Sequence, residues 1–247
     1  MEYRRCMIVS GRGGSGKSTF AVGLSIALAR AGVRVCLADL DTDEPSLDMY
    51  LGLEDRAVYH IGDLTDPARP VSEAAIVHPA YPNLTFLPGV AQKTLTASEI
   101  HALLKRVERE LTPDVLLVDT CARTAHAVAG ETEMAYLVLT DSPLALRSAT
   151  SLADTLREGG LTDMRLVVNR LTAPTDLRDL IDRTGVPLGA IVLEDHELDG
   201  YQREADLSNL EKNTYVGVAC VNLVARMRGE YAPLLSRMGL NRKKWLG

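Results

Sequence analysis

The sequence predicts an α/β protein built on a single doubly wound, mostly parallel sheet with helices on both faces. Two observations support this prediction. Short runs of Val, Ile, Leu and Ala recur along the chain and are apolar throughout, which is typical of strands buried on both faces. Longer amphipathic segments separate these runs, as helices do when they connect parallel strands. A chain of 247 residues is long enough to bury such a core.

The expected elements alternate in order along the chain. The apolar runs predict strands at residues 6–10, 33–39, 84–87, 115–119, 135–139, 164–168 and 188–192. Helices are predicted at residues 18–30, 98–111, 144–158, 175–184 and 215–229. In a sheet of this kind a ligand binds beyond the carboxyl ends of the strands.

Composition and charge exclude several classes of protein. The chain has 27 Lys and Arg against 33 Asp and Glu, a net charge of −6, which argues against a protein that coats nucleic acid over its whole surface. No apolar run is long enough to span a bilayer, and the N-terminus does not read as a signal peptide. The four cysteines form no C-x-x-C pair, so they indicate reduced thiols in a cytoplasmic protein.

The sharpest motif is GRGGSGKS at residues 11–18, between a predicted strand and a predicted helix. It matches G-x-x-x-x-G-K-[ST], in which glycines let backbone N–H groups converge on phosphate oxygens at a helix N-terminus. We expect Lys17 to bind the β and γ phosphates of a nucleotide and the Ser18 hydroxyl to bind Mg²⁺. The predicted nucleotide-binding residues of the loop are Gly11, Gly13, Gly14, Ser15, Gly16, Lys17, Ser18 and Thr19.

Residues 12–18 resemble the K-G-G-x-G-K-[ST] variant of this loop, which marks the MinD/ParA-type ATPases. In that family the first lysine of the loop reaches across a dimer interface to the partner's nucleotide. The corresponding residue is Arg12, so the resemblance implies an ATP-dependent homodimer in which Arg12 serves catalysis. Arginine keeps the charge but differs from lysine in reach and geometry, and a solvated surface arginine is the alternative.

Three aspartates complete the predicted site. Asp39 and Asp41 follow the second predicted strand on one side of the chain, and Asp119 ends the apolar run at residues 115–118. Carboxylates beside a phosphate-binding loop can serve Mg²⁺ and the attacking water. The resemblance implies that Asp41 orients or activates the water, whereas Asp39 and Asp119 join Ser18 around the metal. Strand-end capping or turn formation is the alternative for Asp39 and Asp41.

The chain departs from the family's pattern after Asp119. Family members usually continue D-[ST]-P-[AP]-G, whereas residues 119–123 read DTCAR, without Pro or Gly. This segment, which is switch II in the family, is therefore expected to move differently and to couple hydrolysis to a partner differently. Cys121 beside the nucleotide would suit an iron–sulfur cluster only with a second suitably placed cysteine, and the sequence offers none.

The base is expected to lie against two later segments. Residues 167–170, VVNR, resemble the family's V-[VI]-N-R segment, which implies adenine recognition by Asn169 with Arg170 beside it. An asparagine amide can offer both a donor and an acceptor to the Watson–Crick edge. Residues 188–195 resemble the G-x-I-P-E-D segment that borders adenine, with Leu193 where proline is usual.

The C-terminal end is basic. From Arg226 onward six basic residues face one acid, Glu230, a net charge of +5 that leaves −11 for the rest of the chain. We therefore divide the chain into an ATPase domain at residues 1–230 and a tail at residues 231–247. The tail interleaves Trp and Leu with its cations and looks like the membrane-targeting tail of MinD proteins. A solvated terminus is the alternative.

The leading hypothesis is a MinD-like ATPase that binds ATP and Mg²⁺ and hydrolyses ATP slowly under a Min-type activator or effector protein. It would dimerise with ATP and cycle on and off an anionic membrane from the cytoplasm, because two joined tails bind better than one. Its output would be the position of division or of another cellular structure. Three alternatives are a ParA-like partition ATPase, which the acidic body disfavours, a metallocluster accessory protein, and a nucleotide-binding scaffold with weak or no turnover.

Overall fold

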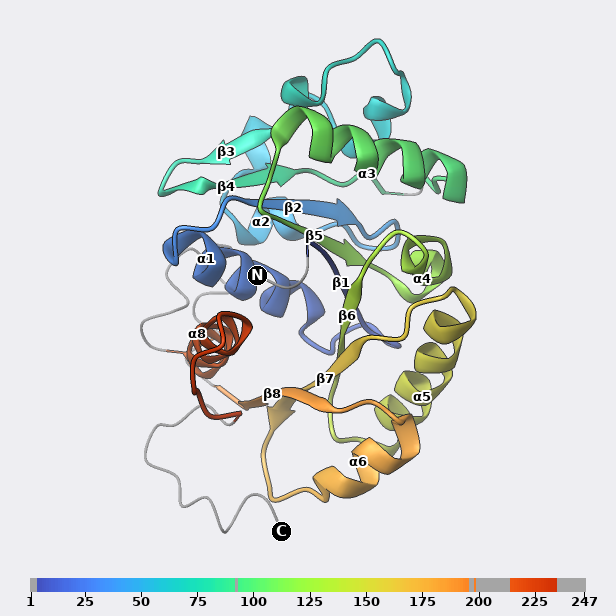
Figure 1. Ribbon diagram of the computed structural model, residues 1–247, viewed down its shortest axis with the longest axis vertical. Helices are drawn as coiled ribbons and strands as arrows, with labels where there is room; N and C mark the ends of the chain where they lie inside the picture. Colours follow the sequence, from blue (N-terminus) through green and yellow to red (C-terminus); the bar gives the residue numbers. More distant parts are fainter. Residues whose placement is uncertain (1–3, 92, 196–197, 199–213, 235–247) are drawn as a thin grey trace.

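The computed structural model describes residues 4–91, 93–195, 198 and 214–234. At its centre is an eight-stranded sheet in the order β3-β4-β2-β5-β1-β6-β7-β8, parallel throughout except for the β3–β4 pair (Figure 1). The strands are β1 (Arg5–Val9), β2 (Val35–Leu40), β3 (Ile76–His78), β4 (Tyr81–Leu87), β5 (Val115–Thr120), β6 (Met134–Leu139), β7 (Met164–Leu171) and β8 (Leu188–Leu193). The predicted fold class is confirmed.

Helices cover both faces of this sheet. They are α1 (Lys17–Arg30), α2 (Leu47–Tyr50), α3 (Ala97–Leu111), α4 (Ala122–Ala129), α5 (Pro143–Glu158), α6 (Leu177–Thr184) and α8 (Tyr215–Met227). Short 3-10 turns occupy Glu54–Arg56, Ile61–Thr65 and Val71–Glu73. α1 and α8 lie on one face of the sheet, whereas α3, α4, α5 and α6 lie on the other (Figure 1).

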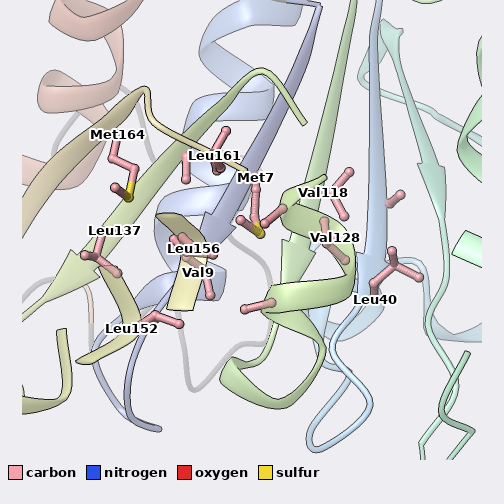
Figure 2. Close-up of a cluster of buried hydrophobic side chains, with 14 of the residues drawn as sticks. Met7, Val9, Leu40, Val118, Val128, Leu137, Leu152, Leu156, Leu161 and Met164 are labelled. Atoms are coloured by element: carbon pink, nitrogen blue, oxygen red, sulfur yellow. The ribbon is translucent and has the colours of Figure 1, made fainter. Parts of the chain in front are cut away.

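The central strands bury both of their faces, which explains why their sequences are apolar throughout. In β1, Met7 and Val9 point into the core beneath α4 and α5 (Figure 2), whereas Cys6 and Ile8 point into the core beneath α1 and α8. α1 is itself buried along most of its length, because α8 packs on it from outside. The helix that follows the phosphate-binding loop is thereby fixed from two sides.

All seven predicted strands and all five predicted helices occur, with ends shifted by a few residues at most. The sequence analysis missed β3, α4 and the four-residue α2. β3 has three residues and pairs only with β4 at the sheet edge, too short for an alternating pattern to be recognised. α4 has eight residues and begins directly after β5, so the apolar run of the strand hides its start.

The segment after α8 returns to the edge strand β8. The Ile191 amide donates to the Leu234 carbonyl at 3.0 Å, and the Arg226 guanidinium donates to the carbonyls of Pro233 (2.7 Å), Ala232 (3.4 Å) and Gly189. Partial burial lowers the pKa of Arg226. Arg226, which the charge count of the C-terminal end includes, therefore fixes the root of the tail, residues 231–234, to β8. Residues 235–247 of the predicted tail lie outside the described residues.

None of the helices in the described part of the chain combines the length and the apolar character that a membrane span requires.

Replacing Arg226 with Met should destabilise the protein, because carbonyl groups from β8 and from the tail root lose their donor. We expect a loss of about 1–3 kcal/mol in the free energy of unfolding, measured by urea denaturation. The matched control is Arg228→Met, since Arg228 is exposed two residues further along, at the C-cap of α8. We call these hydrogen bonds of Arg226 the clamp. Equal losses of unfolding free energy in the two variants would contradict its role in stability.

Candidate functional site

The order of the central strands brings the predicted residues together. β5 lies between β1 and β2, so the loop after β1 and the aspartates at the ends of β2 and β5 meet at one edge of the sheet. Asp39 and Asp119 are direct neighbours in the parallel register of β2 and β5. Residues separated by 80 positions in the chain thus share one site beneath the loop.

The loop is shaped by its glycines and by the elements behind it. Gly14 and Gly16 have φ angles of 75° and 82°, which side chains rarely adopt. The Asn169 side-chain amide donates to the Ser15 carbonyl at 2.8 Å, and a Cβ at Gly16 would collide with that amide. At Gly11 a Cβ would come within 2.8 Å of Ser148 in α5. β7 and α5 therefore hold the loop in shape, and glycine is required at both positions.

Lys17 is a buried cation between two carboxylates. Its Nζ lies 2.8 Å from Asp119 Oδ2 and 2.9 Å from Asp41 Oδ2. Burial opposes the charge of Lys17, but the two carboxylates outweigh it, so the pKa of Lys17 is raised above its ordinary value of 10.5. For Asp41, burial is in turn outweighed by the charge and hydrogen bond of Lys17, and the pKa of Asp41 is lowered. Both groups are ionised at neutral pH.

The pKa values of the two deeper carboxylates, Asp39 and Asp119, are shifted in the opposite direction to that of Asp41. Burial raises the pKa of Asp119, and burial together with the charge of Asp119 raises the pKa of Asp39. Asp39 accepts hydrogen bonds from the amides of Asp41 (3.0 Å) and Leu47 (3.4 Å), so it also organises the loop after β2.

The residues present fit a magnesium ion. Among the described residues, Asp119 Oδ1 is buried and has no hydrogen-bond partner. The Ser18 hydroxyl lies 3.4 Å from the other oxygen of the same carboxylate. An unpartnered carboxylate oxygen beside a hydroxyl is the hard oxygen donor set that Mg²⁺ prefers. Ser18 and Asp119, with Asp39 below them, could hold the ion between the loop and the sheet.

A cavity of about 320 Å³ extends from the loop toward β7, β8 and α8. Its loop end is polar, and its far end is lined by Val192, Leu193 and Val216, which suits a flat base at the far end and phosphates at the loop. Arg170 lines the rim and forms an ion pair with Glu194 at 3.0 Å. Thr19, in the first turn of α1, lines the loop end.

Arg12 is exposed at the mouth of this cavity and also lines a second one of about 560 Å³ on the other side of the loop. The Ser10 hydroxyl donates to the Arg12 carbonyl at 2.9 Å. Within the described ranges, no ion pair holds the Arg12 guanidinium. The second cavity is lined by the loop, the residues after β2 and the start of α4, including Asp43, Cys121 and Arg123.

The structure therefore gathers every site residue predicted from the sequence. Gly11, Asp39 and Asp119 lie beside or beneath the first cavity, and the others line it. The sequence analysis missed Val216 and the role of Asp195, whose carboxylate accepts from the Tyr215 amide at 2.7 Å and so fixes the start of α8 at the cavity. No local pattern marks Val216 or the contact between Asp195 and Tyr215, because α8 reaches the cavity only through the tertiary fold.

A glycine-rich loop between a strand and a helix, with a lysine and strand-end aspartates beneath it, defines a P-loop nucleotide-binding domain. Residues 6–207 match the family described as the CobQ/CobB/MinD/ParA nucleotide binding domain, and the chain belongs to this family. The resemblance to MinD/ParA-type proteins is thus confirmed.

Its relatives include proteins named for septum placement. The chain is 31% identical to the putative septum site-determining protein MinD of Emiliania huxleyi, over 92% of this chain and 88% of that protein. It is 29% identical to the septum site-determining protein MinD of Bacillus subtilis, over 92% and 90%.

Solved MinD structures share the fold. The MinC:MinD cell division protein complex of Aquifex aeolicus contains a chain that superposes with a TM-score of 0.85 at 24% identity, covering 94% of this chain and 98% of that one. MinD of Pyrococcus horikoshii, complexed with Mg-ADP, superposes with a TM-score of 0.78 at 22% identity, covering 91% and 95%.

Replacing Lys17 with Met should destabilise the nucleotide-free protein by about 3 kcal/mol, because two buried carboxylates lose their cation. Adding Asp119→Asn to Lys17→Met removes one of the stranded charges and should recover part of this loss. The measurement is urea denaturation without nucleotide, with the exposed Lys105→Met as the control. Full stability in the Lys17 variant would show that the carboxylates do not depend on Lys17.

Proposed function

We propose that this chain is a MinD-like ATPase that hydrolyses ATP to ADP and phosphate and so helps to position the division site or another cellular structure. The observation that carries the proposal is the Lys17 ion pair with Asp41 and Asp119 at the foot of the P-loop. It joins a phosphate-binding cation to a carboxylate that can serve a water molecule and to a carboxylate that suits a metal ion. The septum site-determining relatives support the cellular role.

The residues of the chain would act in sequence on ATP. Phosphate oxygens compete for the donors of Lys17 and for the N–H groups of the loop. As Lys17 turns toward the phosphates, Asp41 is released to accept a hydrogen bond from the attacking water, while the amides of Asp43 and Glu44 still orient its carboxylate. Mg²⁺, when bound through Ser18 and Asp119, neutralises charge on the phosphates. The Asn169 side-chain amide donates one hydrogen bond to the Ser15 carbonyl, and its remaining donor and acceptor would bind adenine.

Asp41→Asn should slow ATP hydrolysis by about 10²-fold, because the amide cannot take a proton from water. ATP binding should change far less, since Lys17 and the loop amides remain in place. The measurements are phosphate release and the affinity for ATP, with the exposed Asp55→Asn as the control. Equal rates of hydrolysis in the Asp41 variant and the unmodified protein would remove Asp41 from the mechanism. Phosphate release by the unmodified protein that does not exceed the rate without protein would favour a scaffold without turnover.

The proposed cycle couples nucleotide to membrane. Two ATP-bound copies would join across the mouth of the P-loop, where Arg12 is exposed and available to the partner's phosphates. The pair would then present two basic tails to an anionic bilayer and bind peripherally from the cytoplasm, since linked binding segments gain avidity. A Min-type protein would serve as the partner that stimulates hydrolysis.

Binding to anionic vesicles should require ATP and the tail. We expect co-sedimentation of the full chain to be at least about tenfold stronger with ATP than with ADP, because avidity needs the dimer. A chain ending at residue 234 keeps the tail root and serves as the matched control, which should stay in solution. Binding without nucleotide, or equal binding to neutral vesicles, would contradict the cycle.

A further inference from the structure

Two residues distinguish switch II of this chain from the family's pattern, and both contact the loop after β2. Cys121, at the position where the pattern has proline, places its Sγ 3.8 Å from the Thr42 hydroxyl. Arg123, at the position of the pattern's glycine, places its Nη2 2.5 Å from Asp43 Oδ1. Proline and glycine carry neither a thiol nor a cation, so these contacts belong to this sequence.

The loop after β2 determines where Asp41 points. Asp41 Oδ1 accepts the amides of Asp43 (2.9 Å) and Glu44 (3.2 Å), while Oδ2 faces Lys17. The backbone of Asp43 thus orients the Asp41 carboxylate, and the side chain of Asp43 is held by Arg123. Ligand-type atoms of Asp41, Asp43 and Cys121 all lie within 4.8 Å of one another, so the chain of contacts is compact.

The residues of switch II that make these contacts are held in place by α4, which packs against the core. Arg123 lies in its first turn, and the buried face formed by Ala125, Val128 and Ala129 packs in the core. Thr124 bonds to the Thr120 hydroxyl and fixes the turn from β5 into the helix. In contrast, Asp43 and Glu44 are exposed at the rim of the second cavity. The ion pair therefore ties an exposed loop to a packed helix.

We propose that Arg123 is a positioning residue, which holds the loop after β2 against α4 through Asp43 and so keeps Asp41 oriented for hydrolysis. The Asp43–Arg123 ion pair and the Thr42–Cys121 contact together form what we call the strap. Its effect on turnover rests on the proposed ATPase function. The strap itself is a property of the nucleotide-free chain and can be tested without any activity.

Cys121 reports directly on the strap. The other cysteines, Cys6, Cys36 and Cys220, have no exposed surface, whereas Cys121 is 6% exposed and lines the second cavity. A maleimide should label Cys121 slowly in the nucleotide-free protein. The reagent reaches Cys121 when the loop after β2 moves away from α4. Loss of an exposed ion pair favours this open form only modestly, so Arg123→Ala or Asp43→Ala should each speed labelling about two- to fivefold.

The design separates the pair from its surroundings. The Asp43→Ala/Arg123→Ala double variant should label no faster than either single variant, because both remove the same contact. The charge-exchanged variant, Asp43→Arg with Arg123→Asp, should return labelling toward the original rate. Arg183→Ala is the control, since it breaks a similarly exposed ion pair with Asp179 on α6 and should leave labelling unchanged.

Steady-state kinetics test what the strap does. Arg123→Ala should lower kcat for ATP about three- to tenfold with little change in KM, because misplacement of Asp41 affects chemistry more than binding. Charge exchange should restore kcat. Unchanged labelling in both single variants overturns the strap, and altered labelling with an unchanged kcat overturns its role in positioning Asp41. If the unmodified chain does not hydrolyse ATP, the proposed function and the kinetic claim fail together, while labelling still decides whether the strap exists.

Discussion

The Lys17 ion pair with Asp41 and Asp119 is the interaction on which the site depends. A buried ammonium is stable only when counter-charges surround it, and here these come from the ends of two different strands. The need to pair this charge fixes three segments relative to one another: the start of α1, the loop after β2 and the end of β5. A nucleotide phosphate is also an anion, so it can replace a carboxylate at Lys17 without leaving the cation unpaired. The charge of Lys17 thus holds the site together without nucleotide and can pair with the phosphates when a nucleotide binds.

The charges of the nucleotide-free site do not balance, and this imbalance is informative. Three carboxylates face one ammonium, and burial raises the pKa of both Asp39 and Asp119. A fold selected for stability alone would place apolar residues at such buried positions. Their presence indicates stability given up for binding, because a divalent cation supplies the missing positive charge. Asp119 Oδ1, which has no hydrogen-bond partner in the part of the chain that the structure describes, is the oxygen that suits such a cation.

Local patterns predicted most of the fold and most of the candidate site. Apolar runs marked the central strands because those strands are buried on both faces, and the P-loop was visible because its glycines, Lys17 and Ser18 are contiguous. What the sequence could not show depends on contacts between distant segments. The sequence shows Arg226 only as one of several basic residues near the C-terminus, whereas the return of the chain to β8 lets its guanidinium bond to carbonyls of β8 and of the tail root. Asp43 and Arg123 lie 80 positions apart and meet only because β2 and β5 are neighbours.

The same neighbour relations connect the nucleotide cavity to the root of the tail. α8 begins at the cavity, where the Tyr215 amide bonds to Asp195, and its last turn contains Arg226, which binds the tail root to β8. β8 in turn ends at the cavity, where Val192 and Leu193 line the base end. α8 and β8 therefore both connect the nucleotide cavity to the root of the tail. Under the proposed cycle, adenine at the far end of the cavity would lie against α8 and β8, so a shift of α8 against β8 there would act directly on the hydrogen bonds of Arg226. The adenine end of the nucleotide, and not only its phosphates, would then act on the elements that carry the tail.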